Sequence, residues 1–133
     1  MKKVKVFIEK GADEYSAFMD DTPLSYSCIG TGSTVEEAID DFKQAYEEMR
    51  SYYTSIGKDF EEIEVEFFYD VPSFLQDYAY AFTLAGLERI TGVNQKQLGH
   101  YISGYRKPSR RTIDKIQKSV RIFANNLAAV RFS

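Results

Sequence analysis

The side chains with the most evident chemical use lie in one stretch of the sequence, TGVNQKQLGHYISGYRKPS, residues 91–109. Five of them, which we expect to point outward from a short helix, can hydrogen-bond base edges or hold phosphates: Gln95, Lys96, Gln97, His100 and Tyr101. Amide, amine and imidazole groups gathered on one helix are typical of a helix that enters the major groove of DNA. The stretch therefore predicts a contact with DNA.

The residues around these five predict the local structure that presents them. Gly92 stands where a tight turn needs a positive φ, Asn94 is a favourable N-cap, and Gly104 ends the helix. Three apolar residues are expected to face a core: Val93, Leu98 and Ile102. A turn followed by such a short helix predicts a helix-turn-helix. The alternative is an ordinary helical hairpin whose polar face only meets water.

Cations follow the predicted recognition helix. Arg106 and Lys107 lie in the loop after it, and Arg110 and Arg111 begin the next helix, where the helix dipole disfavours positive charge. We expect these four side chains to hold DNA phosphates; the alternative is a basic patch that only improves solubility. The residues predicted to contact DNA are therefore Asn94, Gln95, Lys96, Gln97, His100, Tyr101, Ser103, Arg106, Lys107, Arg110 and Arg111.

Charge divides the 133-residue chain into two halves. Residues 1–72 hold 7 lysines and arginines against 17 aspartates and glutamates, a net charge of −10. Residues 73–133 hold 10 against 3, a net charge of +7. The basic half is expected to bind nucleic acid, and the acidic half to meet something else, such as a basic protein. Pro72 disfavours helix at Val71, so we predict domains at residues 1–70 and 73–133.

The acidic half predicts the element order βββαβ. Alternating apolar residues indicate four strands, over residues 4–8, 15–19, 24–29 and 63–69. Gly30-Thr31-Gly32 is expected to form a turn after the third strand. Thr34 and Glu37 then form a capping box, which begins a helix with an apolar stripe that continues to Ile56. This order predicts one sheet covered by one helix.

The basic half predicts four helices, over residues 73–82, 84–91, 94–103 and 109–130. Ser73 is expected to cap the first helix, and Ser109 the last. The apolar stripe of the last helix is long for three short helices to cover. Its outer end, Phe123 to Val130, is expected either to associate with a second copy or to complete the core. The whole sequence thus predicts an α+β protein, a βββαβ domain followed by an all-α helix-turn-helix domain.

Composition favours a cytoplasmic protein. The segment MKKVKVFIEK lacks the apolar run of a signal peptide, and no stretch reaches the length of a membrane span. The single cysteine, Cys28, excludes an internal disulfide and is expected to be an inert buried residue. The acidic residues recur with the period of solvent-exposed faces, so we expect neither catalytic residues nor a metal site, and no cofactor.

Both halves together resemble the HicB-type antitoxins of type II toxin–antitoxin systems. In the N-terminal half the likeness is carried by Tyr15-Ser16-Ala17-Phe18-Met19-Asp20, Gly30-Thr31-Gly32-Ser33-Thr34 and Val35-Glu36-Glu37-Ala38. In the C-terminal half it is carried by Phe68-Tyr69-Asp70, Gly92-Val93-Asn94 and Tyr101-Ile102-Ser103-Gly104, which resemble the helix-turn-helix branch of the family. The family often has a proline-glycine pair before the third strand, where this chain has Pro23-Leu24-Ser25-Tyr26.

The resemblance implies a partial RNase H-like fold without nuclease residues for the N-terminal domain. It also implies two partners, a HicA-like RNA-cleaving toxin and double-stranded operator DNA. The DNA would be bound by a homodimer or tetramer that represses its own operon. Two alternatives remain. One is a stand-alone helix-turn-helix repressor with a ligand- or protein-sensing N-terminal domain, and the other is a degenerate nuclease.

Overall fold

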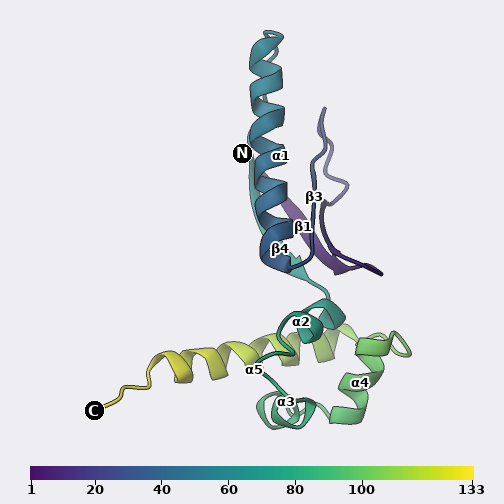
Figure 1. Ribbon diagram of the computed structural model, residues 1–133, viewed down its shortest axis with the longest axis vertical. Helices are drawn as coiled ribbons and strands as arrows, with labels where there is room; N and C mark the ends of the chain where they lie inside the picture. Colours follow the sequence, from purple (N-terminus) through teal and green to yellow (C-terminus); the bar gives the residue numbers. More distant parts are fainter. The chain divides into compact units, whose positions relative to one another are not determined.

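The computed structural model describes residues 1–133, which form two compact units, Met1–Ser73 and Phe74–Ser133 (Figure 1). The elements are β1 (Lys2–Lys10), β2 (Tyr15–Met19), β3 (Ile29–Gly32), α1 (Val35–Ser55), β4 (Ile63–Tyr69), α2 (Val71–Asp77), α3 (Leu84–Thr91), α4 (Gln95–Ser103) and α5 (Arg110–Ala128). The predicted fold class is confirmed: the order βββαβ is followed by an all-helical region. None of the helices has the length and apolar character that crossing a membrane requires.

The first unit is a four-stranded mixed sheet with one helix on one face. The strands lie in the order β3-β2-β1-β4, and β1 runs antiparallel to β2 but parallel to β4. Val6 and Ile8 of β1 are buried with Phe42 of α1, as the alternation of apolar residues predicted. The intervening residues, Lys5 and Phe7 among them, lie on the opposite face of the sheet.

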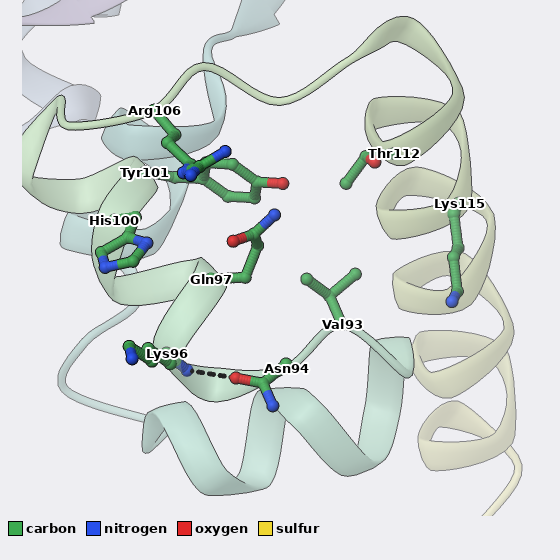
Figure 2. Close-up of a pocket in the computed structure, with 9 residues that line it drawn as sticks. All are labelled: Val93, Asn94, Lys96, Gln97, His100, Tyr101, Arg106, Thr112 and Lys115. Atoms are coloured by element: carbon green, nitrogen blue, oxygen red, sulfur yellow. Dashed lines mark hydrogen bonds between the residues drawn. The ribbon is translucent and has the colours of Figure 1, made fainter.

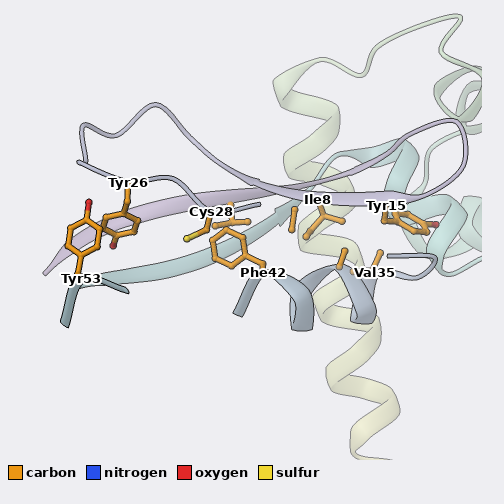
Figure 3. Packing of buried hydrophobic residues seen from close by; sticks show 10 residues of the cluster. Ile8, Tyr15, Tyr26, Cys28, Val35, Phe42 and Tyr53 are labelled. Atoms are coloured by element: carbon orange, nitrogen blue, oxygen red, sulfur yellow. The ribbon is translucent and has the colours of Figure 1, made fainter. Parts of the chain in front are cut away.

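Aromatic side chains extend this core along the whole of α1 (Figure 3). Beyond Phe42, the rings of Tyr26 and Phe60 stack with their centroids 4.7 Å apart, and Tyr53 packs edge-on against both. The Tyr26 hydroxyl donates to the Glu61 carbonyl over 2.6 Å, and burial raises the pKa of Tyr26, which keeps this donor protonated. Aromatic rings whose hydroxyl groups are hydrogen-bonded therefore complete the packing at this end of the core.

The third strand was predicted to begin five residues and to end three residues too early. The structure places β3 at Ile29–Gly32, so Gly30 and Gly32 lie in the strand and do not form the predicted turn. A Cβ atom at Gly30 would overlap the Ala38 carbonyl oxygen and the Phe42 backbone nitrogen, so glycine is needed where the strand touches α1. The segment expected as strand, residues 24–29, instead forms a loop up to residue 28 that still buries Tyr26.

The expectation that Pro72 disfavours helix at Val71 is also wrong. Helix α2 begins at Val71 and ends at Asp77, whereas we expected a helix from Ser73 to Phe82. Proline is tolerated in the first turn because an N–H there has no partner within the helix. Asp70 accepts a hydrogen bond from the Ser73 N–H over 2.8 Å, while the buried Ser73 hydroxyl accepts from the Lys10 N–H. The Ser73 hydroxyl thus links the start of α2 to the end of β1 by a hydrogen bond.

The start of α1 follows the prediction with one difference. The Thr34 hydroxyl accepts from the Glu37 N–H over 3.1 Å, which confirms the N-cap. The Glu37 carboxylate, however, accepts from the N–H and hydroxyl of Ser33, one residue before the cap. These hydrogen bonds from Ser33 lower the pKa of Glu37, so the carboxylate remains charged beside the positive end of the helix dipole.

We expect Gly30→Ala to lower the free energy of unfolding by about 3 kcal/mol, because the added methyl group meets backbone atoms of α1 that cannot move aside. Gly57→Ala is the control: its φ of 69° disfavours a side chain, but nothing lies within 4 Å of the added Cβ. That change should cost about 1 kcal/mol. Urea denaturation followed by the NMR signals of residues 2–69 measures both. Equal losses would contradict the close approach of β3 to α1.

Candidate nucleic-acid interface

A left-handed glycine joins α3 to α4. Gly92 has φ 72°, and its N–H donates to the Glu88 carbonyl, which ends α3 as the sequence predicted. The Thr91 hydroxyl donates to the Leu87 carbonyl over 2.7 Å and accepts from the Val93 N–H over 3.1 Å. Since the side chains of Thr91 and Val93 are both buried, the turn is fixed by hydrogen bonds and by packing.

Two side chains cap the start of α4. The Asn94 side-chain oxygen accepts from the Lys96 N–H over 2.8 Å (Figure 2), which confirms the predicted N-cap. The Glu88 carboxylate accepts from the Gln95 N–H over 2.8 Å. These two backbone donors are therefore occupied and do not offer their N–H groups to a bound anion.

Burial divides α4 into an inner and an outer face. Leu98 is fully buried, while Gln95 and Lys96 are exposed, as expected. Gln97 and His100 are half-buried. The expectation that Tyr101 points outward is wrong: the residue is 3% exposed, because its spacing of three from Leu98 puts it on the same side of the helix.

A pocket lies between α4 and the first two turns of α5. Figure 2 shows Gln97 and Tyr101 turned toward Thr112 across this space. Thr112 and Lys115 were not among the predicted site residues, although Lys115 lies one helical turn after Arg111. The Lys115 ammonium group is 3.5 Å from the Gly92 carbonyl oxygen. The full lining is Val93, Asn94, Lys96, Gln97, His100, Tyr101, Arg106, Thr112 and Lys115.

His100 and Ser103 differ in the hydrogen bonds that their side chains make within the chain. The ring of His100 packs beside Tyr105 with the centroids 4.9 Å apart, and its Nδ1 atom is buried without a hydrogen-bond partner in the chain. The Ser103 hydroxyl is already used, because it donates to the His100 carbonyl and accepts from the Tyr105 N–H. Both contacts help α4 to end at Gly104, as predicted, and Gly104 has φ 78°.

The cations beside α4 are almost all without an acidic partner. Arg106, Lys107 and Arg111 are exposed and have no carboxylate within 4 Å. Arg110 differs, because its guanidinium lies 3.1 Å from the Asp114 carboxylate one turn later. Asp114 therefore offsets part of the cost of placing Arg110 at the positive end of the α5 dipole, whereas Arg111 has no such partner. Of the ten lysines and arginines in residues 73–133, nine have no ion pair.

The metal-binding and nucleophilic side chains of the chain do not form a second site. No three histidine, cysteine, aspartate or glutamate side chains lie close enough together to hold a metal ion. Cys28 is buried in the core, its N–H donates to the Met19 sulfur, and burial raises the pKa of the thiol. A thiol in this state is a weak nucleophile.

The geometry of the second unit thus suits a polyanion with hydrogen-bonding edges. Exposed polar side chains stand on the outer face of α4, and uncompensated cations lie in the loop after it and on the first turn of α5. No protein family, curated protein or solved structure was found to match this chain.

We expect Asn94→Ala to lower the free energy of unfolding of this unit by about 1 kcal/mol, because the Lys96 N–H loses its acceptor. Asn94→Asp keeps the acceptor and should leave stability within about 0.5 kcal/mol of the wild type. Urea denaturation followed by the NMR amide signals of residues 84–103 measures the effect in this unit alone. The capping role is refuted if alanine and aspartate at position 94 are equally stable.

Proposed function

We propose that this chain is a DNA-binding antitoxin that neutralises a basic, HicA-type ribonuclease and represses its own operon in the cytoplasm. The observation that carries the proposal is the α3–Gly92–α4 geometry, which leaves Gln95 and Lys96 exposed beside cations that have no internal partner. The charge division supports it, since the basic unit suits DNA and the acidic unit suits a cationic protein.

In this proposal α4 is the recognition helix. Gln95, Lys96, Gln97 and His100 face the bases, where amide groups pair with adenine and lysine with guanine. Tyr101, being buried, holds α4 in place. The DNA backbone is held by the cations around the helix, namely Arg106, Lys107, Arg111 and Lys115. Lys115 enters this set because it lines the pocket beside the Gly92 turn.

A second copy of the chain completes the DNA-binding form. Exposed apolar residues lie along the outer end of α5 and just beyond it: Ile122, Leu127 and Val130. Phe123 is instead half-buried, with its ring centroid 5.9 Å from that of Phe82. Burial of the exposed residues between two copies would give a two-fold dimer, which reads half-sites about one helical turn, or a multiple of it, apart.

The acidic unit supplies the toxin-binding function in this proposal. Only three of the 17 carboxylates in residues 1–72 take part in ion pairs: Glu47, Glu61 and Glu62. The remainder produce a field that attracts a cationic partner and raises the rate of association. The resemblance of the N-terminal segments to the HicB family favours a HicA-type ribonuclease as this partner.

For DNA, we expect the double variant Arg106→Ala/Lys107→Ala to bind all sequences more weakly. In the wild type the slope of log K against log salt should lie between about −3 and −4 per half-site. In the variant this slope should be shallower by about 2. The matched control is Lys118→Ala/Arg121→Ala, which removes the same charge from exposed positions further along α5. Fluorescence anisotropy with the promoter DNA of the gene, between 50 and 300 mM salt, compares them. An equal change of slope in both variants would contradict a localised interface.

For the toxin, we expect expression of this chain to restore growth in cells that express the cognate HicA-type ribonuclease. The two proteins should also elute as one complex, because the acidic unit masks the cationic surface of the toxin. The Arg106→Ala/Lys107→Ala variant is the control and should neutralise equally well, since its changes lie in the other unit. DNA binding without any neutralisation would favour a stand-alone repressor instead.

A further inference from the structure

The face of the sheet opposite α1 carries a row of apolar side chains, one from each strand. The strand register places Phe18 beside Phe7 and beside Ile29, and places Phe68 on the other side of Phe7. The ring centroid of Phe7 lies 5.8 Å from that of Phe18 and 6.4 Å from that of Phe68. We call these four residues, Phe7, Phe18, Ile29 and Phe68, the open-face row.

The open-face row is accessible to a partner. Phe7 is 37% exposed and Ile29 is 59% exposed, while Phe18 and Phe68 are half-buried. The neighbours of Phe7 along β1, Val6 and Ile8, point the other way into the core beneath α1 and are at most 1% exposed. The first unit has no second helix that could cover this face.

Acidic residues surround the row. On the same face, Glu64 and Glu66 of β4 stand opposite Lys3 and Lys5 of β1. Glu9 lies on the other side of the row, and Asp20 and Asp70 directly follow β2 and β4. Five carboxylates thus accompany two ammonium groups, although Asp20 also accepts from the Lys5 and Thr22 N–H groups and Asp70 from the Ser73 N–H. The Lys5 ammonium group lies 5.1 Å from the centre of the Phe68 ring. An apolar centre with a mainly negative rim is complementary to an apolar patch with a positive rim.

The outer face of α1 is the other acidic surface of this unit, but it lacks such a centre. Between Val35 and Ser51 every exposed side chain is charged or polar, with Asp40 and Glu48 as examples. Charges of this kind accelerate encounter, whereas buried aromatic anchors supply most of the affinity in protein interfaces. Two open faces of this chain would also bring their acidic rims together, which disfavours a second copy as the occupant.

We infer that the open-face row is the docking surface for the basic toxin, with Phe7 and Phe68 as anchors and the surrounding acids paired to its lysines and arginines. The inference rests on the proposed function, which supplies the partner but not the surface. It assigns to α1 the role of attracting the toxin from a distance.

The test uses the full chain and a catalytically inactive form of the cognate HicA-type ribonuclease, with affinity measured by isothermal titration calorimetry. We expect Phe7→Thr/Phe68→Thr to weaken toxin binding by about 30-fold or more, while threonine maintains the strand. Glu64→Gln/Glu66→Gln, which leaves the rings intact, should weaken binding by about 10-fold. The control Asp40→Asn/Glu48→Gln removes the same charge from α1 and should change the affinity by less than about 3-fold.

The outcomes separate the inference from the proposed function. Circular dichroism and promoter binding should be unchanged in all three variants, which shows that the chain remains folded. If the wild-type chain binds the toxin and both sheet variants bind it equally well, the docking surface is elsewhere. If sedimentation shows that the phenylalanine variant changes only the oligomeric state, the row joins two copies. If the wild-type chain does not bind the toxin, the proposed function fails and this inference fails with it.

Discussion

The packing of α4 decides which side chains of the second unit are available to a ligand. Val93 and Leu98 are buried, and Tyr101 fills the space one turn further along, so the helix has one possible orientation. Gly92 allows that orientation because its positive φ ends α3 and changes the direction of the chain before α4. Gln95 and Lys96 are exposed as a consequence of this burial. The packing of the core beneath α4 therefore determines which side chains form the candidate interface.

Charge takes little part in holding either unit together. The four ion pairs of the chain are formed by exposed side chains, which contribute about 1 kcal/mol or less each. Stability must come instead from apolar burial, such as the packing of Phe42 against the sheet and of Tyr26 against Phe60. Most carboxylates of the first unit and most cations of the second have no ion pair within the chain. Those that also accept no hydrogen bond from the chain can bind external charges without breaking contacts that the fold needs.

Sequence patterns predicted the elements well where local physics decides them. The caps Thr34, Asn94 and Ser109 all accept the backbone hydrogen bonds expected of them. Failures occurred where a distant segment decides the outcome. Gly30 and Gly32 have the local signature of a turn, yet they lie in a strand because α1 approaches too closely for a side chain. Tyr101 has the polar group of an outward residue, but its ring is large enough for the core to retain it.

The open-face row shows why some surfaces cannot be recognised from spacing alone. Each of its residues occupies the outer position of an alternating strand, where a single exposed apolar side chain is ordinary. They meet only because β2 pairs antiparallel to β1 and β4 pairs parallel to it, so that Phe18 and Phe68 arrive on either side of Phe7. A shift of one residue in either pairing would move these rings to the other face of the sheet. The row is therefore fixed by the same register that buries Val6 and Ile8, which ties the candidate docking surface to the stability of the core.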